Sequence, residues 1–224
     1  MSERYTLKNF DIEALKRMEA TVILKPANIT IHDTTRVDSI VKIEGGRGVY
    51  LGPGVHISSF VHLNIGGGKL TVDENVAITS GVEILTGTNT ADGRSMSSAA
   101  PPEEQVVERW ETHIEHRAFL GMGCRILQGC KYIGRYAIVA AGSEVNHDVP
   151  PYAIVLGSPA RIIGDRRNRP GWHWGDGDEA PLNIPAEREQ AIANAIKEKY
   201  GFDITSNYAS DFLRFITAIV DKLP

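Results

Sequence analysis

Residues 114–161 read IEHRAF LGMGCR ILQGCKY IGRYAI VAAGSE VNHDVPPYAIVLGSPAR, and an aliphatic residue opens each of these units. The spacing is six residues with one step of seven, which fits neither an amphipathic helix nor the alternation of an ordinary strand. A parallel β-helix has this period, because each unit makes one short strand and the turn to the next, and three units close a triangular coil. The second inward position of the units holds small residues, namely Ala118, Cys124, Cys130, Ala137 and Ser143.

The same period extends toward the N-terminus and predicts about five coils. The aliphatic openers form the triplets Ile31, Val37, Ile43; Leu51, Ile57, Leu63; Val72, Ile78, Ile84; Ile114, Leu120, Ile126; and Ile133, Val139, Val145. Every additional residue falls after the third opener of a triplet, and the longest excursion covers residues 85–113. All insertions are therefore expected to leave the prism at one corner. Because insertions on one edge of a repeat array usually build the binding face, we expect the active site there.

Composition excludes several classes of protein. The 224 residues are 42% hydrophobic with a net charge of −4, which gives no attraction for nucleic acid or an anionic membrane. No apolar run approaches the roughly 18 to 20 residues that span a bilayer, and the sequence MSERYTLKNF lacks a secretory pattern. Two cysteines in packing positions indicate neither a disulfide framework nor a thiolate metal site. We therefore expect a cytoplasmic protein.

The chain divides into three parts. Residues 1–30 are predicted to cap the open end of the β-helix, including a strand at 21–24. Residues 31–164 form the β-helix, and its loop 85–113 is expected to be an arm that packs against a neighbouring subunit. Residues 165–224 combine a turn-rich linker with two amphipathic helices.

A ladder of charged residues is predicted along the third face of the prism. The positions just before the third openers are Lys42, His62, Glu83, Arg125 and Glu144. They stack at the roughly 4.8 Å strand spacing. A solvated ladder of opposite charges explains this pattern. The pair His62 and Glu83 is also of the type that tunes a general base.

Residues 51–161 resemble the hexapeptide-repeat acyltransferases, especially the branch of galactoside, maltose and virginiamycin-type acetyltransferases. The segment VAAGSEVNHDVPPYAIVLGSPARIIG is similar to that branch's closing pattern of Gly-Ser, a polar pair, Asp-Ile/Val-Pro-Pro and Gly-x-Pro-Ala-Lys/Arg. The resemblance implies a left-handed β-helix, a homotrimer, acetyl-CoA as the donor, and a sugar or amino sugar as the acceptor.

The resemblance also places the catalytic residues and shows one departure. The run from Glu74 to Asn89 matches the family's run that ends in a general-base histidine, but this chain has Asn89 there. Asparagine cannot accept the proton, and a general base contributes roughly 10²- to 10⁴-fold to rate. Three substitutes remain open: His62 with Glu83 as its orienting carboxylate, His113, and Asp92. An acceptor that is already a free amine would need less help from a base than a hydroxyl.

On the donor side, the resemblance places the pantetheine arm along Gly121, Met122, Ala141, Gly142 and Ser143. Phe119 stands where the family has a stacking tryptophan, and Asn146 and His147 replace its Thr-Lys pair. The remaining donor contacts are expected from Pro159 of the closing pattern and from Arg161, Arg166 and Arg167. The guanidinium groups of the three arginines suit phosphates.

Two other functions remain open. The first is a trimeric scaffold or regulatory protein that keeps the fold without turnover. The second is a zinc enzyme similar to the γ-carbonic anhydrases, which needs three converging histidines. His113 and His116 lack the paired spacing of that enzyme, so no metal is expected.

Overall fold

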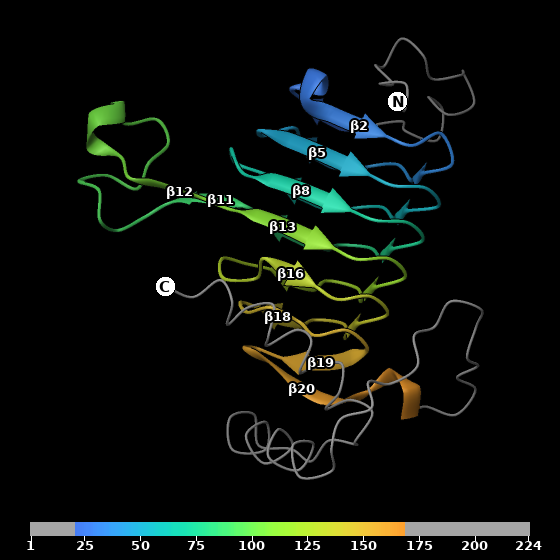
Figure 1. The fold of residues 1–224 in the computed structure, drawn as a ribbon. Helices are drawn as coiled ribbons and strands as arrows, with labels where there is room; N and C mark the ends of the chain where they lie inside the picture. The colour runs from blue at the N-terminus through green and yellow to red at the C-terminus, as the bar shows by residue number, and fades with distance from the viewer. Residues whose placement is uncertain (1–20, 169–224) are drawn as a thin grey trace, which may run out of the picture.

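The computed structural model describes residues 21–168, which form a triangular stack of short parallel strands (Figure 1). Residues 1–20 and 169–224 lie outside the described part, and with them the predicted C-terminal helices and most of the N-terminal cap. Three sheets, each named by its first strand, make the three faces of the prism. The predicted fold class, an all-β left-handed parallel β-helix, is confirmed.

Consecutive strands along the chain belong to different sheets. The β1 sheet contains β1 (Val22–Leu24), β4 (Lys42–Glu44), β7 (His62–Asn64), β10 (Glu83–Leu85), β15 (Arg125–Ile126) and β18 (Glu144–Val145). The β2 sheet contains β2 (Ile29–Ile31), β5 (Gly48–Leu51), β8 (Lys69–Val72), β13 (Glu111–Ile114) and β16 (Tyr132–Ile133). The β3 sheet contains β3 (Arg36–Val37), β6 (His56–Ile57), β9 (Ala77–Ile78), β14 (Phe119–Leu120), β17 (Ile138–Val139), β19 (Ala153–Gly157) and β20 (Ala160–Asp165).

The aliphatic openers stack inside the prism in the predicted register. In the β2 sheet, for example, Ile31 pairs with Leu51, Leu51 with Val72, Val72 with Ile114, and Ile114 with Ile133. All fifteen openers are buried, as are the small residues of the second inward position. Full burial of one such aliphatic side chain contributes about 1.5 to 3 kcal/mol, so the period-six pattern supplies the core.

Corners between the sheets use left-handed backbone. Where the β3 sheet meets the β1 sheet, Ile40 (φ 61°) and Phe60 (φ 65°) occupy this conformation, and Gly81, Gly123 and Gly142 occupy it in coils further along the stack. An L-residue pays roughly 1–2 kcal/mol in this region, whereas glycine does not. The corner therefore tolerates side chains in two coils and carries only glycine in three.

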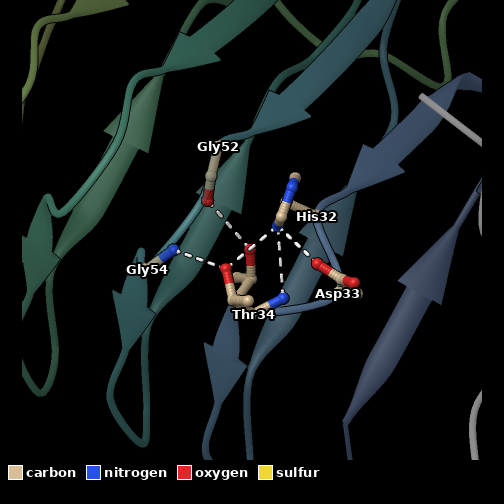
Figure 2. A network of polar contacts seen from close by, with 6 residues as sticks. His32, Asp33, Thr34, Gly52 and Gly54 are labelled. Atoms are coloured by element: carbon tan, nitrogen blue, oxygen red, sulfur yellow. Dashed lines mark hydrogen bonds and ion pairs between the residues drawn. The ribbon is translucent and has the colours of Figure 1, made fainter. Parts of the chain in front are cut away.

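The corner that follows β2 is held by a local polar network (Figure 2). The amide of Thr34 donates to His32 Nδ1 at 3.2 Å, and the Thr34 hydroxyl accepts from the Gly54 amide of the next coil at 3.0 Å. Thr35 donates its hydroxyl to the carbonyl of Gly52 at 2.9 Å. His32 is therefore occupied by its own turn, and the network ties the first two coils together.

An arm leaves the prism between β10 and β13. It contains the antiparallel pair β11 (Gly87–Asn89) and β12 (Val107–Arg109) with the short 3-10 helix η3 (Pro102–Glu104), and it projects away from the stack (Figure 1). A Cβ added at Gly66 would stand 2.7 Å from the carbonyl oxygen of Gly87, and one at Gly68 would overlap the carbonyl oxygens of Thr86 and Trp110. The arm therefore leaves from the same edge as Gly66, Gly67 and Gly68, the glycine triplet between β7 and β8, which confirms the predicted insertion edge.

The described part ends in an antiparallel pair. β19 and β20 pair across the turn at Ser158 and Pro159, and the short 3-10 helix η4 (Arg166–Asn168) follows. At the other end, β1 pairs with β4 in parallel, before the 3-10 helix η2 (Pro26–Asn28). Among residues 21–168, no helix has the length and apolarity needed to cross a membrane.

Candidate active site

The root of the arm is fixed to the prism by backbone hydrogen bonds. The Trp110 amide donates to the Thr86 carbonyl at 3.0 Å, and the Lys69 amide donates to the Trp110 carbonyl at 3.0 Å. Arg47 donates Nε to the Gly67 carbonyl at 2.7 Å, which ties the preceding coil to the glycine triplet. The faces on both sides of this edge thus have a defined position relative to the arm.

His62 lies on the β1 sheet between two carboxylates. Its Nε2 is 3.1 Å from Glu44 Oε1, and its Nδ1 is 4.0 Å from Glu83 Oε1. Burial alone would raise the pKa of Glu44, but hydrogen bonds from Lys42 and His62 lower it below its ordinary value. Both ring nitrogens of His62 therefore face acidic groups of the ladder.

A second histidine repeats this arrangement on the β3 sheet. His56 Nε2 lies 3.1 Å from Asp38 Oδ2, and Arg36 Nε donates to Asp38 Oδ1 at 2.9 Å. Burial would raise the pKa of Asp38, yet the hydrogen bonds from His56 and Arg36 lower it. The two pairs connect the first and second coils on adjacent faces.

These pairs predict that the fold loses stability in acid. A carboxylate whose folded pKa is depressed contributes stability above its unfolded pKa, near 4, and this contribution disappears as pH falls through the folded pKa. We expect Asp38→Asn to lower the free energy of unfolding at pH 6 by about 0.5–1 kcal/mol, and therefore to lower the melting temperature. This difference between variant and wild type should vanish near pH 2. Thermal melts across this range, with Glu103→Gln at the exposed tip of the arm as control, test it. A difference independent of pH would contradict the assignment.

His113 lies on the β2 sheet, two residues after Glu111, the first residue of β13. Its Nε2 is 2.9 Å from Asp73 Oδ2, and its ring meets the edge of Tyr132 with 6.2 Å between centroids. Its side chain is 44% exposed. Asp73 was not found from the sequence, although it directly follows the opener Val72 in the adjacent coil, and this position could have indicated it.

The two remaining candidates lie in the arm. Asn89 donates its side-chain amide to the Met96 carbonyl at 3.1 Å and to Gln105 Oε1 at 3.0 Å. Asp92 is exposed and receives a hydrogen bond from the Thr90 hydroxyl at 3.2 Å. Neither is hydrogen-bonded to His62 or His113. These two hydrogen bonds of Asn89 stabilise the arm. The amide group donates both of them without gaining or losing a proton.

Most of the residues predicted for the pantetheine arm meet at the corner between the β3 and β1 sheets. The Gly142 amide donates to the Met122 carbonyl at 2.9 Å, and Met122 is 65% exposed. A Cβ at Gly123 or Gly142 would meet no atom within 4 Å, so the space outside these glycines is open. Ser143 instead points inward, and its Oγ accepts from the Gly157 amide at 3.3 Å. Asn146 and His147 lie past β18, at the next corner.

Phe119 and Arg166 meet at a cavity of about 460 Å³ at the corner between the β2 and β3 sheets. Arg117, Tyr136 and Asn75 line it with them, and the sequence indicated none of these three as a site residue. The side chains of the other predicted donor contacts have different partners. Arg161 donates to the Ala160 carbonyl, Arg167 forms a buried ion pair with Asp165 at 2.6 Å, and Pro159 follows a cis peptide bond in the β19–β20 turn.

Within residues 21–168, no group of three or more His, Cys, Asp and Glu side chains is arranged to hold a metal ion. Cys124 and Cys130 are buried, and burial raises the pKa of both thiols, that of Cys124 to about 12. Neither thiol is therefore ionised near neutral pH.

The chain is similar in sequence to known acyltransferases. No family model matches the chain. The dTDP-4-amino-4,6-dideoxy-D-glucose acyltransferase of Escherichia coli is 26% identical over 148 residues, which cover 63% of this chain and 74% of that protein. The dTDP-3-amino-3,6-dideoxy-alpha-D-galactopyranose 3-N-acetyltransferase of Aneurinibacillus thermoaerophilus is 45% identical over 53 residues, or 24% of this chain and 27% of that protein.

A solved structure shares the fold. The N-acyltransferase AntD from Bacillus cereus, in complex with dTDP and 3-hydroxybutyryl-CoA, superimposes with a TM-score of 0.63 at 21% identity and covers 70% of this chain and 89% of that chain. The resemblance of the chain to the hexapeptide-repeat acyltransferases is confirmed by the relatives above, and AntD shows the shared fold.

Proposed function

We propose that the protein is an acyl-CoA-dependent acyltransferase that forms an amide on an amino sugar. Two of the similar proteins acylate amino sugars linked to dTDP, and AntD binds an acyl-CoA. The observation that carries the assignment in this chain is the half-exposed His113, whose Nε2 contacts Asp73. Such a pair holds an imidazole in one tautomer with the other nitrogen turned to the substrate.

The reaction needs one proton acceptor. The amine nitrogen of the sugar attacks the thioester carbonyl carbon, and a C–N bond forms while the C–S bond breaks. His113 Nδ1 takes the proton that the nitrogen loses and returns it to the departing thiolate. Asp73 positions the ring and stabilises the imidazolium that forms in between. An amine needs less assistance than a hydroxyl, which agrees with Asn89 at the position of the family's histidine.

The location of the two halves of this site supports an oligomer. The open glycine corner lies between the β3 and β1 sheets, whereas His113 lies on the β2 sheet, which is the opposite side of the triangular prism. A thioester along the glycine corner therefore cannot reach His113 of the same chain. A second copy must supply one of the halves, as in the expected homotrimer, and the arm is suited to join the copies.

Turnover over a panel of acceptors tests the proposed function. We expect release of free CoA thiol from acetyl-CoA with dTDP-linked amino sugars, and a mass increase of the sugar by one acetyl group. Sugars that offer only hydroxyl groups should react about 10²-fold more slowly or not at all. CoA binding without thiol release for every acceptor would contradict the proposed activity and favour the alternative, a trimeric scaffold.

A complementation experiment tests the shared site. We expect His113→Asn and Gly142→Ile each to abolish transfer, the second by filling the open space of the donor corner. The φ of Gly142 is 69°, and Ile40 keeps its side chain at φ 61° in the same corner, so the fold should tolerate the substitution. When the two variants are co-expressed, about one quarter of the interfaces in randomly mixed oligomers join two intact halves and should regain activity.

The control is Gly81→Ile, which adds a side chain at φ 73° in the same column but in a coil without predicted donor contacts. It should keep near wild-type transfer and CoA affinity. Mixed oligomers without activity, formed from folded subunits, would contradict a site shared between copies.

A further inference from the structure

The β2 sheet carries a column of outward side chains in which Tyr132 follows His113. The residues just before the first opener of each triplet make this column and pair in parallel register, namely Thr30, Tyr50, Thr71, His113 and Tyr132. The rings of His113 and Tyr132 meet edge to face, with 6.2 Å between centroids and 79° between planes. The imidazole is therefore held by Asp73 from the coil before it and by an aromatic ring from the coil after it.

Two other outward histidines have a carboxylate partner in the coil before them but no ring in the coil after them. His56 contacts Asp38 and stands in register with Ala77 of the next coil, and His62 contacts Glu44 and stands in register with Glu83. Neither a methyl group nor a carboxylate offers an imidazole the flat apolar surface of a ring. His113 therefore differs from these two histidines in its contact with the following coil.

Tyr132 is itself fixed at its backbone and at its hydroxyl. Its amide donates to Asp148 Oδ1 at 2.9 Å. Its hydroxyl is hydrogen-bonded to Glu115, and burial, followed by this carboxylate, raises the pKa of the phenol, so the hydroxyl stays protonated. Glu115 Oε2 also accepts from the Arg135 amide at 2.8 Å. A tyrosine held at both ends has little freedom to turn away from the His113 ring.

We propose that Tyr132 is a positioning residue, which holds the His113 ring in the orientation that turns Nδ1 toward the acceptor amine. The inference rests on the proposed function, in which His113 accepts the proton. The His113 side chain is 44% exposed, so the carboxylate contact at Nε2 alone leaves its ring free to rotate. A misplacement of about 1 Å at a reacting group can cost about 10²-fold in rate. Tyr132 acts through His113 and does not itself touch the reacting atoms.

Steady-state kinetics of the full chain test this role. We expect Tyr132→Ala to lower kcat for amine acylation about tenfold or more, while the KM for acetyl-CoA stays close to that of the wild type. Tyr132→Phe keeps the ring and should lose less than about threefold. The matched control is Tyr50→Ala, which removes an exposed tyrosine from the same column, two coils before His113, and should leave kcat unchanged. If thermal melts show that Tyr132→Ala is unfolded, Tyr132→Leu replaces it with the same expectation.

A double mutant separates positioning from a structural role. Because Tyr132 acts through His113, adding Tyr132→Ala to His113→Asn should cause no further loss of the residual rate. A structural role, or a contact of Tyr132 with the substrate, would lower the rate by the same factor in both backgrounds. That result, or a kcat of folded Tyr132→Ala equal to the wild type, overturns the proposal.

The motion of the His113 ring gives a readout that needs no turnover. Carbon-13 relaxation of its Cε1–H group should show larger picosecond-to-nanosecond motion in Tyr132→Ala than in the wild type or Tyr50→Ala. Unchanged ring motion overturns the positioning role, whether or not the chain is active. Absence of thiol release, or full activity of His113→Asn, would instead overturn the proposed function, and increased ring motion in Tyr132→Ala would still show that Tyr132 holds the ring.

Discussion

Replacement of His113 by asparagine is expected to lower kcat for amine acylation by about 10²- to 10⁴-fold, which is the contribution of a positioned general base. The KM for acetyl-CoA should change little, because His113 is proposed to take the proton of the acceptor amine and not to hold CoA. His62→Asn should stay close to wild type. The physical difference is that both nitrogens of His62 face carboxylates, at 3.1 and 4.0 Å, whereas only Nε2 of His113 is held by one.

The variant Asp73→Asn distinguishes a role of Asp73 in positioning the His113 ring from a purely structural role. The amide can still contact His113 but carries no charge to stabilise the imidazolium, so kcat should fall while the KM for acetyl-CoA stays close to that of the wild type. A merely structural role would lower the melting temperature and leave the kcat of the folded enzyme unchanged. Losses of equal size in His113→Asn and His62→Asn, or a larger loss in His62→Asn, would contradict His113 as the base.

Gly68→Ala is expected to destabilise the fold by about 3 kcal/mol or more, or to prevent folding. The added Cβ would overlap the carbonyl oxygens of Thr86 and Trp110, which are backbone atoms at the root of the arm and cannot rotate away. Urea unfolding monitored by circular dichroism measures the free energy of unfolding.

The matched control is Gly48→Ala, at the first residue of β5 in the preceding coil. Gly48 pairs with Lys69, and its added Cβ would meet only Lys69 Cγ, at 3.9 Å. This variant should be unchanged or slightly more stable, by about 0.4–1 kcal/mol, because alanine restricts the unfolded chain. Equal stability of the two variants would show that the arm root does not pack on the glycine triplet.

The sequence determines the fold of this chain to an unusual depth, because the β-helix repeats one local rule. Each opener must be apolar and each second inward position must be apolar or small, so Val72 and Ile114 can be assigned to neighbouring coils although they are far apart in the sequence. The spacing of the openers also predicted the edge of the prism at which the insertions leave. The paired β11 and β12 within the arm did not, because they depend on contacts outside the repeat.

The candidate site was predicted only in part. His62 and His113 were found by residue type, but the choice between them depends on which carboxylate each ring nitrogen contacts. Asp73 lies 40 positions before His113 and becomes its partner only because the arm is looped out between adjacent coils. Arg117 and Tyr136 escaped notice for a related reason. They occupy corner positions, where the repeat constrains the backbone but does not restrict the type of side chain.

Coordinates of the oligomer with bound CoA test the central claim most directly, namely that the donor corner of one copy meets the β2 sheet of another beside the arm. We expect the pantetheine chain along Gly121 and Gly142, with the His113 ring of a neighbouring copy within about 3.5 Å of the space beyond the thiol. A CoA thiol far from every copy's His113, or a pantetheine chain on a different surface of the prism, would contradict it.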